Sequence, residues 1–175
     1  MPIGGGGLAT GVSTLAKMLN PRIKVIGVEP EGAACMKASL EAGHVVKLPR
    51  VSTIADGTAV QEPGDQIFPY IQENLDEIIT IKDDELIVAF LDMVENHKMI
   101  VENSGLLTVA ALKHLDFEGQ KVVSILSGGN MDVITMASGA ARADQPGPGV
   151  HLLRPAPRPP RRIGACCANH SRLQR

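Results

Sequence analysis

The chain has 175 residues and a net charge of −2, with 44% apolar and 21% charged residues, which is ordinary for one globular domain with a buried core. This balance gives no argument for binding nucleic acid or a membrane surface, and the sequence has neither an apolar stretch of about 18 residues nor a signal-peptide pattern. The three cysteines are too few and too badly spaced for a disulfide framework or a zinc site, so a reduced, cytoplasmic setting is expected.

The first quarter of the chain predicts a helix, a strand and a second helix after a run of four glycines, Gly4–Gly7. Apolar spacing predicts the first helix over residues 8–20. Its apolar face carries Leu8, Val12, Leu15 and Leu19. The β-branched run 23–30 predicts a buried strand, and the small-residue segment 32–43 predicts a helix that ends at its last glycine.

Helices and strands continue to alternate along the rest of the chain. Residues 51–60 are expected to form a loop because they contain an Asp-Gly turn signal. Helices are expected over 65–75, 82–99 and 102–115, and strands over 77–81 and 121–130. Three acids, at positions 83–85, suit the N-terminus of the longest helix. A Ser-Gly-Gly-Asn turn interrupts the last strand.

The predicted strands are continuously apolar, which is typical of strands buried on both faces. We therefore expect an α/β fold with an open parallel sheet covered by helices on both faces. Ligands of such sheets bind at the carboxyl ends of the strands. Both glycine clusters, Gly4–Gly7 and Gly128–Gly129, fall at such ends in this prediction.

The glycine run has the chemistry of an anion site. Consecutive glycines can turn several backbone N–H groups toward one point, and the following helix adds its positive N-terminus. The run therefore predicts binding of a phosphate, although the Gly-Lys-Ser/Thr order of a P-loop is missing. Two alternatives stay open: a flexible linker, and a dinucleotide site in which GGGGLA matches G-x-G-x-x-A and Glu29 binds a ribose.

Five segments resemble the threonine dehydratase (threonine ammonia-lyase) family in order and spacing: PIGGGGLATG, VIGVEPEGA, TIADG, VENSGLLTVAAL and ILSGGN. The resemblance covers roughly residues 2–137. Members of this family are fold-type II pyridoxal-phosphate enzymes, with serine racemase and serine dehydratase as relatives. The resemblance implies pyridoxal 5′-phosphate as cofactor and L-threonine as substrate, with L-serine as a second one. The implied reaction eliminates water from threonine and yields 2-oxobutanoate and ammonia.

The resemblance also implies roles for individual residues. It places the cofactor phosphate on Gly4, Gly5, Gly6, Gly7 and the amide of Leu8. It places Ser127, followed by Gly128, at the pyridine nitrogen, and Asp56, Gly57 and Glu102 near the substrate or the ring. A serine hydroxyl is not acidic enough to keep that nitrogen protonated, which should favour β-elimination. Purely structural roles stay open: two ordinary turns, and a carboxylate that complements a helix N-terminus.

Relatives in this family bind a divalent cation near the position of Glu29. The implied partners are the backbone carbonyl of Ala33 and a carboxylate two residues later. Cys35 stands at that last position here, and hard cations prefer oxygen ligands. The resemblance therefore implies an incomplete cation site.

The lysine that anchors the cofactor in this family precedes the glycine loop, and none of the eight lysines here has the Ser-x-Lys-x-Arg-Gly context. We therefore expect residues 1–137 to be part of the catalytic domain of a longer, homo-oligomeric enzyme, and this chain alone to be inactive. A non-catalytic remnant is the alternative. Residues 138–175 contain seven arginines, one acid and six of the 12 prolines, and we expect a disordered tail, consistent with a shifted reading frame.

Overall fold

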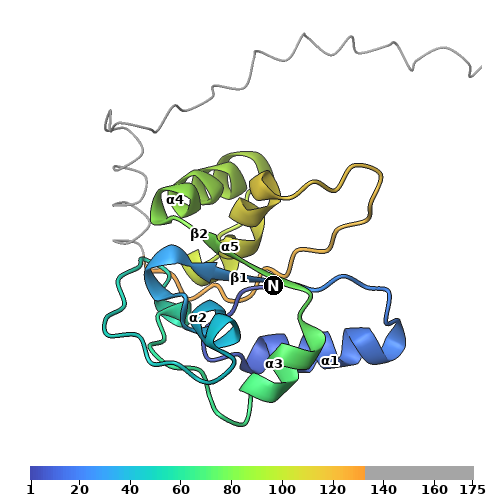
Figure 1. Ribbon diagram of the computed structural model, residues 1–175. Helices are drawn as coiled ribbons and strands as arrows, with labels where there is room; N and C mark the ends of the chain where they lie inside the picture. The colour runs from blue at the N-terminus through green and yellow to red at the C-terminus, as the bar shows by residue number, and fades with distance from the viewer. Residues whose placement is uncertain (133–175) are drawn as a thin grey trace, which may run out of the picture.

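The computed structural model describes residues 1–132, and its centre is a parallel pair of strands, β1 (Ile26–Pro30) and β2 (Glu77–Ile81) (Figure 1). On the other edge of β1 the N-terminus runs parallel to it. The Val28 amide donates to the Met1 carbonyl at 2.9 Å, and the Ile3 amide donates to the Val28 carbonyl at 2.9 Å. β1 is therefore the central element, and the chain enters the glycine run directly from its edge.

Five α-helices cover the two faces of this sheet: α1 (Gly7–Leu19), α2 (Cys35–Ala42), α3 (Phe68–Asn74), α4 (Asp83–Asp92) and α5 (Asn103–Ala110). Figure 1 shows α4 and α5 on one side of the strands and the other three helices on the opposite side. The predicted α/β class with helices on both faces is confirmed, and so are all five predicted helices. However, α4 ends seven residues before the predicted end at 99 and α5 five residues before the predicted end at 115, and a π-helical stretch (Met93–His97) and a 3-10 stretch (Ala111–His114) follow them.

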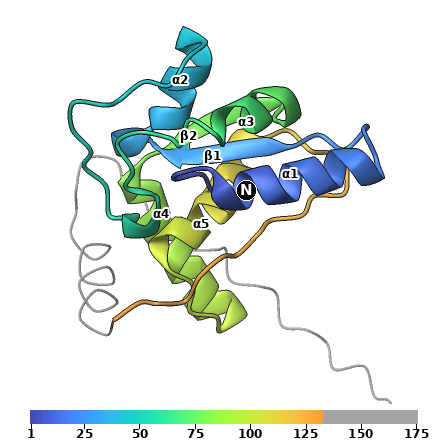
Figure 2. The same ribbon diagram turned by 90° about the horizontal axis from the view of Figure 1, so that it is seen from below.

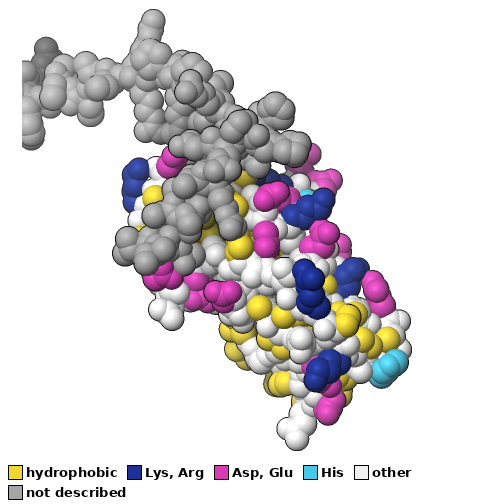
Figure 3. Space-filling view, turned by 90° about the vertical axis from the view of Figure 1, so that its left-hand side faces the viewer, with side chains coloured by type: hydrophobic (Ala, Val, Ile, Leu, Met, Phe, Trp, Pro, Cys, Tyr) yellow, Lys and Arg dark blue, Asp and Glu magenta, His cyan; other side chains and the backbone are white. Residues whose placement is uncertain are grey.

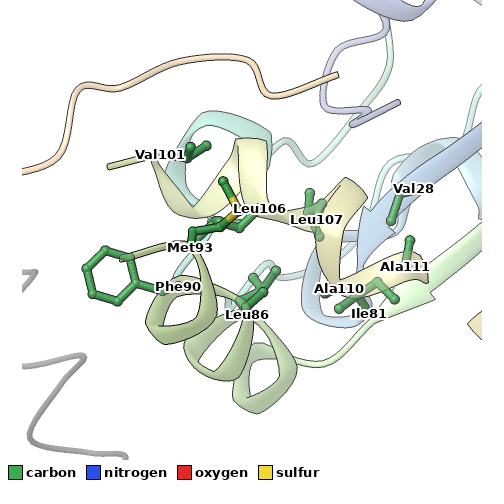
Figure 4. Packing of buried hydrophobic residues seen from close by; sticks show 12 residues of the cluster. Val28, Ile81, Leu86, Phe90, Met93, Val101, Leu106, Leu107, Ala110 and Ala111 are labelled. Atoms are coloured by element: carbon green, nitrogen blue, oxygen red, sulfur yellow. The ribbon is translucent and has the colours of Figure 1, made fainter. Parts of the chain in front are cut away.

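Two apolar clusters hold these layers together. The larger joins β1 and β2 to α4 and α5, with Val28, Ile81, Leu86 and Leu107 buried at its centre (Figure 4). The smaller joins the N-terminal segment to the helices of the other face. Its buried members are Ile3, Ala9, Met36, Phe68 and Ile71. Phe68 and Phe90 are the two aromatic members of these clusters, so aliphatic side chains make up most of the core of the described residues.

The leucine face of α1 is exposed. Leu15 is 57% and Leu19 76% accessible, whereas Ala9 and Ser13 are fully buried. Small side chains allow α1 to approach α3 closely, as the contact between the Asn74 amide group and the Thr14 hydroxyl at 3.4 Å illustrates. The helix was predicted correctly, but its buried face is the one with the small residues.

The strand predicted over residues 121–130 does not form. The segment has no ladder with β1 or β2, and Val123 is 87% accessible. In residues 1–132 both edges of β1 are occupied, by β2 and by the N-terminal segment, and residues 124–130 make their hydrogen bonds with α5 and its N-cap residue Glu102 instead of with a strand. Figure 2 shows this segment, in orange, running past α5 without joining the strands. The expected position of Gly128–Gly129 at a strand end is therefore wrong, although Gly128 has the positive φ, 84°, that glycine turns use.

Charges of both signs are interspersed on the face drawn in Figure 3. Ion pairs occur between elements, as between Lys17 and Asp76 at 2.7 Å and between Lys24 and Glu77 at 2.8 Å. Within the described residues, no helix combines the length and the apolar character that a membrane span requires. The predicted tail at 138–175, and with it the domain boundary at residue 137, lies outside the described residues.

Candidate functional site

A cavity of about 180 Å³ lies where the N-terminal segment leaves the edge of β1. It is bounded by the glycine run and the start of α1, by the turn at residues 57–58, by the N-terminus of α5 and by one residue of the Ser-Gly-Gly-Asn turn. The lining residues are Pro2, Gly4, Gly5, Gly6, Gly7, Leu8, Ala9, Gly57, Thr58, Glu102, Ser104 and Ser127. Segments that are distant in sequence therefore meet at the place predicted for the phosphate.

The glycine run forms a backbone cradle at this cavity. Gly6 has φ of 94° and precedes α1 as its N-cap, and a β-carbon there would stand 2.5 Å from Cγ2 of Ile67. Gly5 and Gly7 face open space, with nothing within 4 Å of the positions of their missing β-carbons. The loop thus needs glycine at position 6 for its backbone shape, and glycines at 5 and 7 leave room for a ligand against the backbone.

The cradle is electrostatically suited to an anion. It leads into the 13-residue helix α1, whose first turn carries no acidic side chain. Unpaired N–H groups at a helix N-terminus carry partial positive charge and bind phosphate oxygens. No lysine or arginine is among the lining residues, so backbone groups supply the attraction in the described part of the chain.

Hydroxyl groups and one carboxylate stand in the rest of the wall. Thr58 and Ser104 are 5% accessible, and their hydroxyl oxygens lie 3.5 Å apart. The Thr58 hydroxyl also donates to the Ala55 carbonyl at 3.0 Å. Glu102 is the N-cap residue of α5 and is half-buried. This wall can form hydrogen bonds with a polar ligand, but it carries no positively charged side chain.

The structure brings most of the predicted residues together. Gly4, Gly5, Gly6, Gly7, Leu8, Gly57, Glu102 and Ser127 all line the cavity. Asp56 does not line it and is exposed, while Gly128 lies behind Ser127 against the Glu102 carboxylate. Sequence reasoning missed Thr58 and Ser104. The one available signal was their adjacency to predicted residues, since Thr58 follows Gly57 and Ser104 is two residues after Glu102.

Glu29 takes part in a different arrangement. Its fully buried carboxylate accepts hydrogen bonds from the amides of Met36 at 2.8 Å and Lys37 at 2.9 Å, and so caps the N-terminus of α2. Burial raises the pKa of Glu29 to about 7, against the opposing effect of these two hydrogen bonds. Burial, and then the Glu29 charge, raise the pKa of the Cys35 thiol to about 11.

This arrangement bears on both roles considered for Glu29. The carboxylate faces α2 and is not part of the cavity wall, so the predicted contact with a ribose at the glycine loop does not occur in this geometry. Ala33 and Cys35, the other positions of the implied cation site, are both buried. Among residues 1–132, no group of three or more His, Cys, Asp and Glu side chains has a metal-binding arrangement.

Comparison with known proteins gives one family. The family model described as "Pyridoxal-phosphate dependent enzyme" matches residues 1–128. The biosynthetic L-threonine dehydratase IlvA of Salmonella typhimurium is 46% identical over 136 residues, which are 75% of this chain and 26% of that protein. The L-threonine ammonia-lyase of Thermotoga maritima is 42% identical over 134 residues, which are 76% of this chain and 33% of that protein.

The chain is also similar to solved structures of a threonine deaminase and a serine racemase. The processed form of threonine deaminase isoform 2 from Solanum lycopersicum matches with a TM-score of 0.75 and 37% identity, over 82% of this chain and 43% of that one. Serine racemase from Dictyostelium discoideum matches with a TM-score of 0.66 and 40% identity, over 75% of this chain and 43% of that one. The chain therefore spans about a quarter to a third of the length of the curated relatives above, and less than half of these solved chains.

Proposed function

The chain belongs to the family of pyridoxal-phosphate-dependent enzymes, and on that premise we propose that its cavity holds the phosphate and the pyridine ring of the cofactor. The observation that supports this most is the cradle at Gly4–Gly7, which leaves open space at Gly5 and Gly7 where side chains would otherwise stand. A phosphate monoester suits this cradle of amides at the start of α1.

The opposite wall suits the ring. Ser127 lines the cavity across from the glycine cradle, and a neutral hydroxyl can hydrogen-bond to a ring nitrogen without transferring a proton to it. The hydroxyls of Thr58 and Ser104 add two polar groups to that wall. When bound, pyridoxal phosphate supplies an electron sink for negative charge at the α-carbon of an amino acid. The residues of this chain would bind the phosphate, orient the ring and shield one side of it from water.

We propose further that the whole protein is a threonine ammonia-lyase, with L-threonine as substrate and L-serine as a second one. Relatives named threonine dehydratase or threonine ammonia-lyase, at 42–46% identity, support this activity. A homo-oligomeric state and a cytoplasmic location are part of the same proposal. The free, buried thiol of Cys35 is consistent with a reducing compartment.

Among residues 1–132, no lysine lines the cavity. We therefore propose that this 175-residue chain binds the cofactor without a covalent link and does not turn over threonine by itself. Among the described residues, Glu102 is the one acidic residue that lines the cavity, and its carboxylate already accepts a hydrogen bond from the Asn130 amide, so we assign it no direct contact with the ligand.

The test is an equilibrium titration of the purified chain with pyridoxal phosphate, pyridoxal and NAD, followed by the absorbance or fluorescence of each ligand. We expect saturable binding of pyridoxal phosphate and at least about tenfold weaker binding of pyridoxal, because loss of the phosphate removes charge-assisted hydrogen bonds. Equal affinity for pyridoxal and pyridoxal phosphate would contradict the phosphate cradle. Tighter binding of NAD would favour the dinucleotide alternative.

A further inference from the structure

The position of Ser127 is not set by a β-ladder. The segment 121–130 is extended but pairs with neither β1 nor β2, so the usual means of fixing a residue at the end of a strand is missing here. Ser127 nevertheless lines the same cavity as the glycine cradle. Within residues 1–132, hydrogen bonds and close contacts with α5 and its N-cap residue Glu102 take the place of a ladder.

The first contacts are at the middle of α5. The Thr108 hydroxyl donates to the Ile125 carbonyl at 3.1 Å, and the Ser124 hydroxyl donates to the Thr108 carbonyl at 3.2 Å. One turn earlier on the helix, Gly105 lies directly against the carbonyl oxygen of Ser127. The segment therefore follows α5 from its middle toward its N-terminus.

The last contacts are made by Glu102 at the N-terminus of α5. Its backbone amide donates to the Gly128 carbonyl at 3.3 Å, and Oε2 of its carboxylate accepts a hydrogen bond from the Asn130 amide at 3.3 Å. The carboxylate also lies against the α-carbon of Gly128, where a β-carbon would come within 2.6 Å of Oε2 and closer still to Oε1. Gly128 has φ of 84°, a conformation that also favours glycine.

We propose that Glu102 is the positioning residue for Ser127. Its carboxylate locks the Ser-Gly-Gly-Asn turn onto the start of α5 and thereby holds the Ser127 hydroxyl at the place where the proposed function puts the pyridine nitrogen. The identity of the ligand in this inference rests on the proposed function. The contacts that hold the Ser-Gly-Gly-Asn segment against Glu102 do not depend on any ligand. A charge-assisted hydrogen bond to a backbone amide, together with close packing on Gly128, makes the carboxylate specific for this turn.

The locking is tested by amide hydrogen exchange in the full chain without ligand. We expect Glu102→Ala to accelerate exchange at the Asn130 amide by about tenfold, the effect of losing one charge-assisted hydrogen bond. Glu102→Gln keeps a carbonyl oxygen as acceptor and should accelerate exchange by only about threefold. The matched control is Glu73→Ala, an exposed glutamate on α3, which should leave this amide unchanged. Amides within α5 serve as the internal reference for global unfolding.

The effect of Glu102 on Ser127 is tested by a double-mutant cycle that measures the affinity for pyridoxal phosphate. Glu102→Ala and Ser127→Ala should each weaken binding by about tenfold, and the double variant should be no weaker than Ser127→Ala alone, because Glu102 acts through Ser127. Independent losses that multiply to about a hundredfold would overturn the positioning role. Unchanged exchange at Asn130 in Glu102→Ala would overturn the locking. If the unmodified chain binds no pyridoxal phosphate, the proposed function fails, and the exchange experiment still decides whether Glu102 holds the turn.

Discussion

Gly105 and Ser127 meet backbone to backbone: a β-carbon on Gly105 would overlap the carbonyl oxygen of Ser127. This contact sets the backbone of Ser127 directly against α5, so that Ser127 and the N-terminus of α5 form adjoining parts of the cavity wall. The cavity geometry therefore depends on a residue that does not itself line the cavity, because Gly105 faces the turn and not the open space.

Gly105→Ala should displace Ser127 from the cavity wall. We expect the affinity for pyridoxal phosphate to fall by about tenfold and the free energy of unfolding to fall by about 1–3 kcal/mol, the usual cost of overpacking a buried contact. Ligand titration and urea denaturation measure the two effects. Gly11→Ala is the matched control, because Gly11 lies on α1 with nothing within 4 Å of its missing β-carbon. A Gly105→Ala chain that binds as tightly as the control would contradict the role of this contact.

Alanine substitutions at two neighbouring glycines of the cradle should have opposite effects: one should lower stability, and the other should weaken ligand binding. Gly6→Ala should lower the free energy of unfolding by about 2 kcal/mol or more, because alanine is strained at φ of 94° and its β-carbon would meet Ile67. Gly5→Ala should leave stability within about 0.5 kcal/mol, since its β-carbon points into open space, but it should block the phosphate. Thermal unfolding and ligand titration of both variants make this comparison. Loss of stability in Gly5→Ala with intact binding would refute it.

The buried Glu29 predicts a dependence of stability on pH. Its pKa is about 7 in the folded chain and near its ordinary value of 4.5 in the unfolded chain, so between these pH values the folded state binds more protons. The contribution of Glu29 to stability is therefore fully present below pH 4.5 and is lost as the pH rises toward 7, by at most about 3.5 kcal/mol at about 1.4 kcal/mol per pKa unit.

Glu29→Gln removes the ionisable group. Subtracting the stability-against-pH curve of this variant from that of the wild type therefore leaves the contribution of Glu29. The subtraction cancels the amine of Met1, whose pKa burial lowers to about 6 and whose effect has the opposite sign, with stability rising as the pH increases from 6 to 8. Glu31→Gln, at an exposed neighbour, is the control. Urea denaturation at a series of pH values measures the curves, and a difference curve that stays flat between pH 4.5 and 7 would rule out the burial argument.

The exposed leucine face of α1 and the buried cluster on its opposite face, which α1 shares with α3, should respond differently to substitution. Leu19→Ser should change the free energy of unfolding by less than about 0.5 kcal/mol, because Leu19 is 76% accessible. Ile71→Ala should cost about 2–5 kcal/mol, because Ile71 on α3 is fully buried in the cluster that α1 helps to form. Denaturation in urea compares the two. A large loss from Leu19→Ser would mean that the leucine face is covered in solution.

The glycine cradle and its position opposite Ser127 could be predicted from the sequence. Four glycines before a helix have few structural uses, and their order relative to the Ser-Gly-Gly-Asn turn matches one family. The use of Glu29 could not be predicted in this way. A glutamate at a strand end is compatible with a ligand contact or with capping the next helix, and only the position of the Met36 and Lys37 amides decides between them.

The errors have physical causes. Residues 121–130 have the composition of a strand, but composition does not report which partner a segment will contact, and this segment makes its hydrogen bonds with α5 instead of with a strand. The periodic leucines of α1 identify a helix but not the side from which α3 approaches. Ser104 escaped notice because a serine in the first turn of a helix is common and carries no signal of a cavity.

The most direct test of the account maps pyridoxal phosphate onto the chain by NMR. The backbone amide signals of the full chain are followed while the ligand is added. We predict that the largest shifts occur at Gly4–Gly7, Leu8 and Ser127, with none of comparable size on α4, because no residue of α4 lines the cavity. Shifts that cluster elsewhere, or that leave the glycine cradle and Ser127 unchanged at saturation, would contradict the proposal that this cavity binds the cofactor.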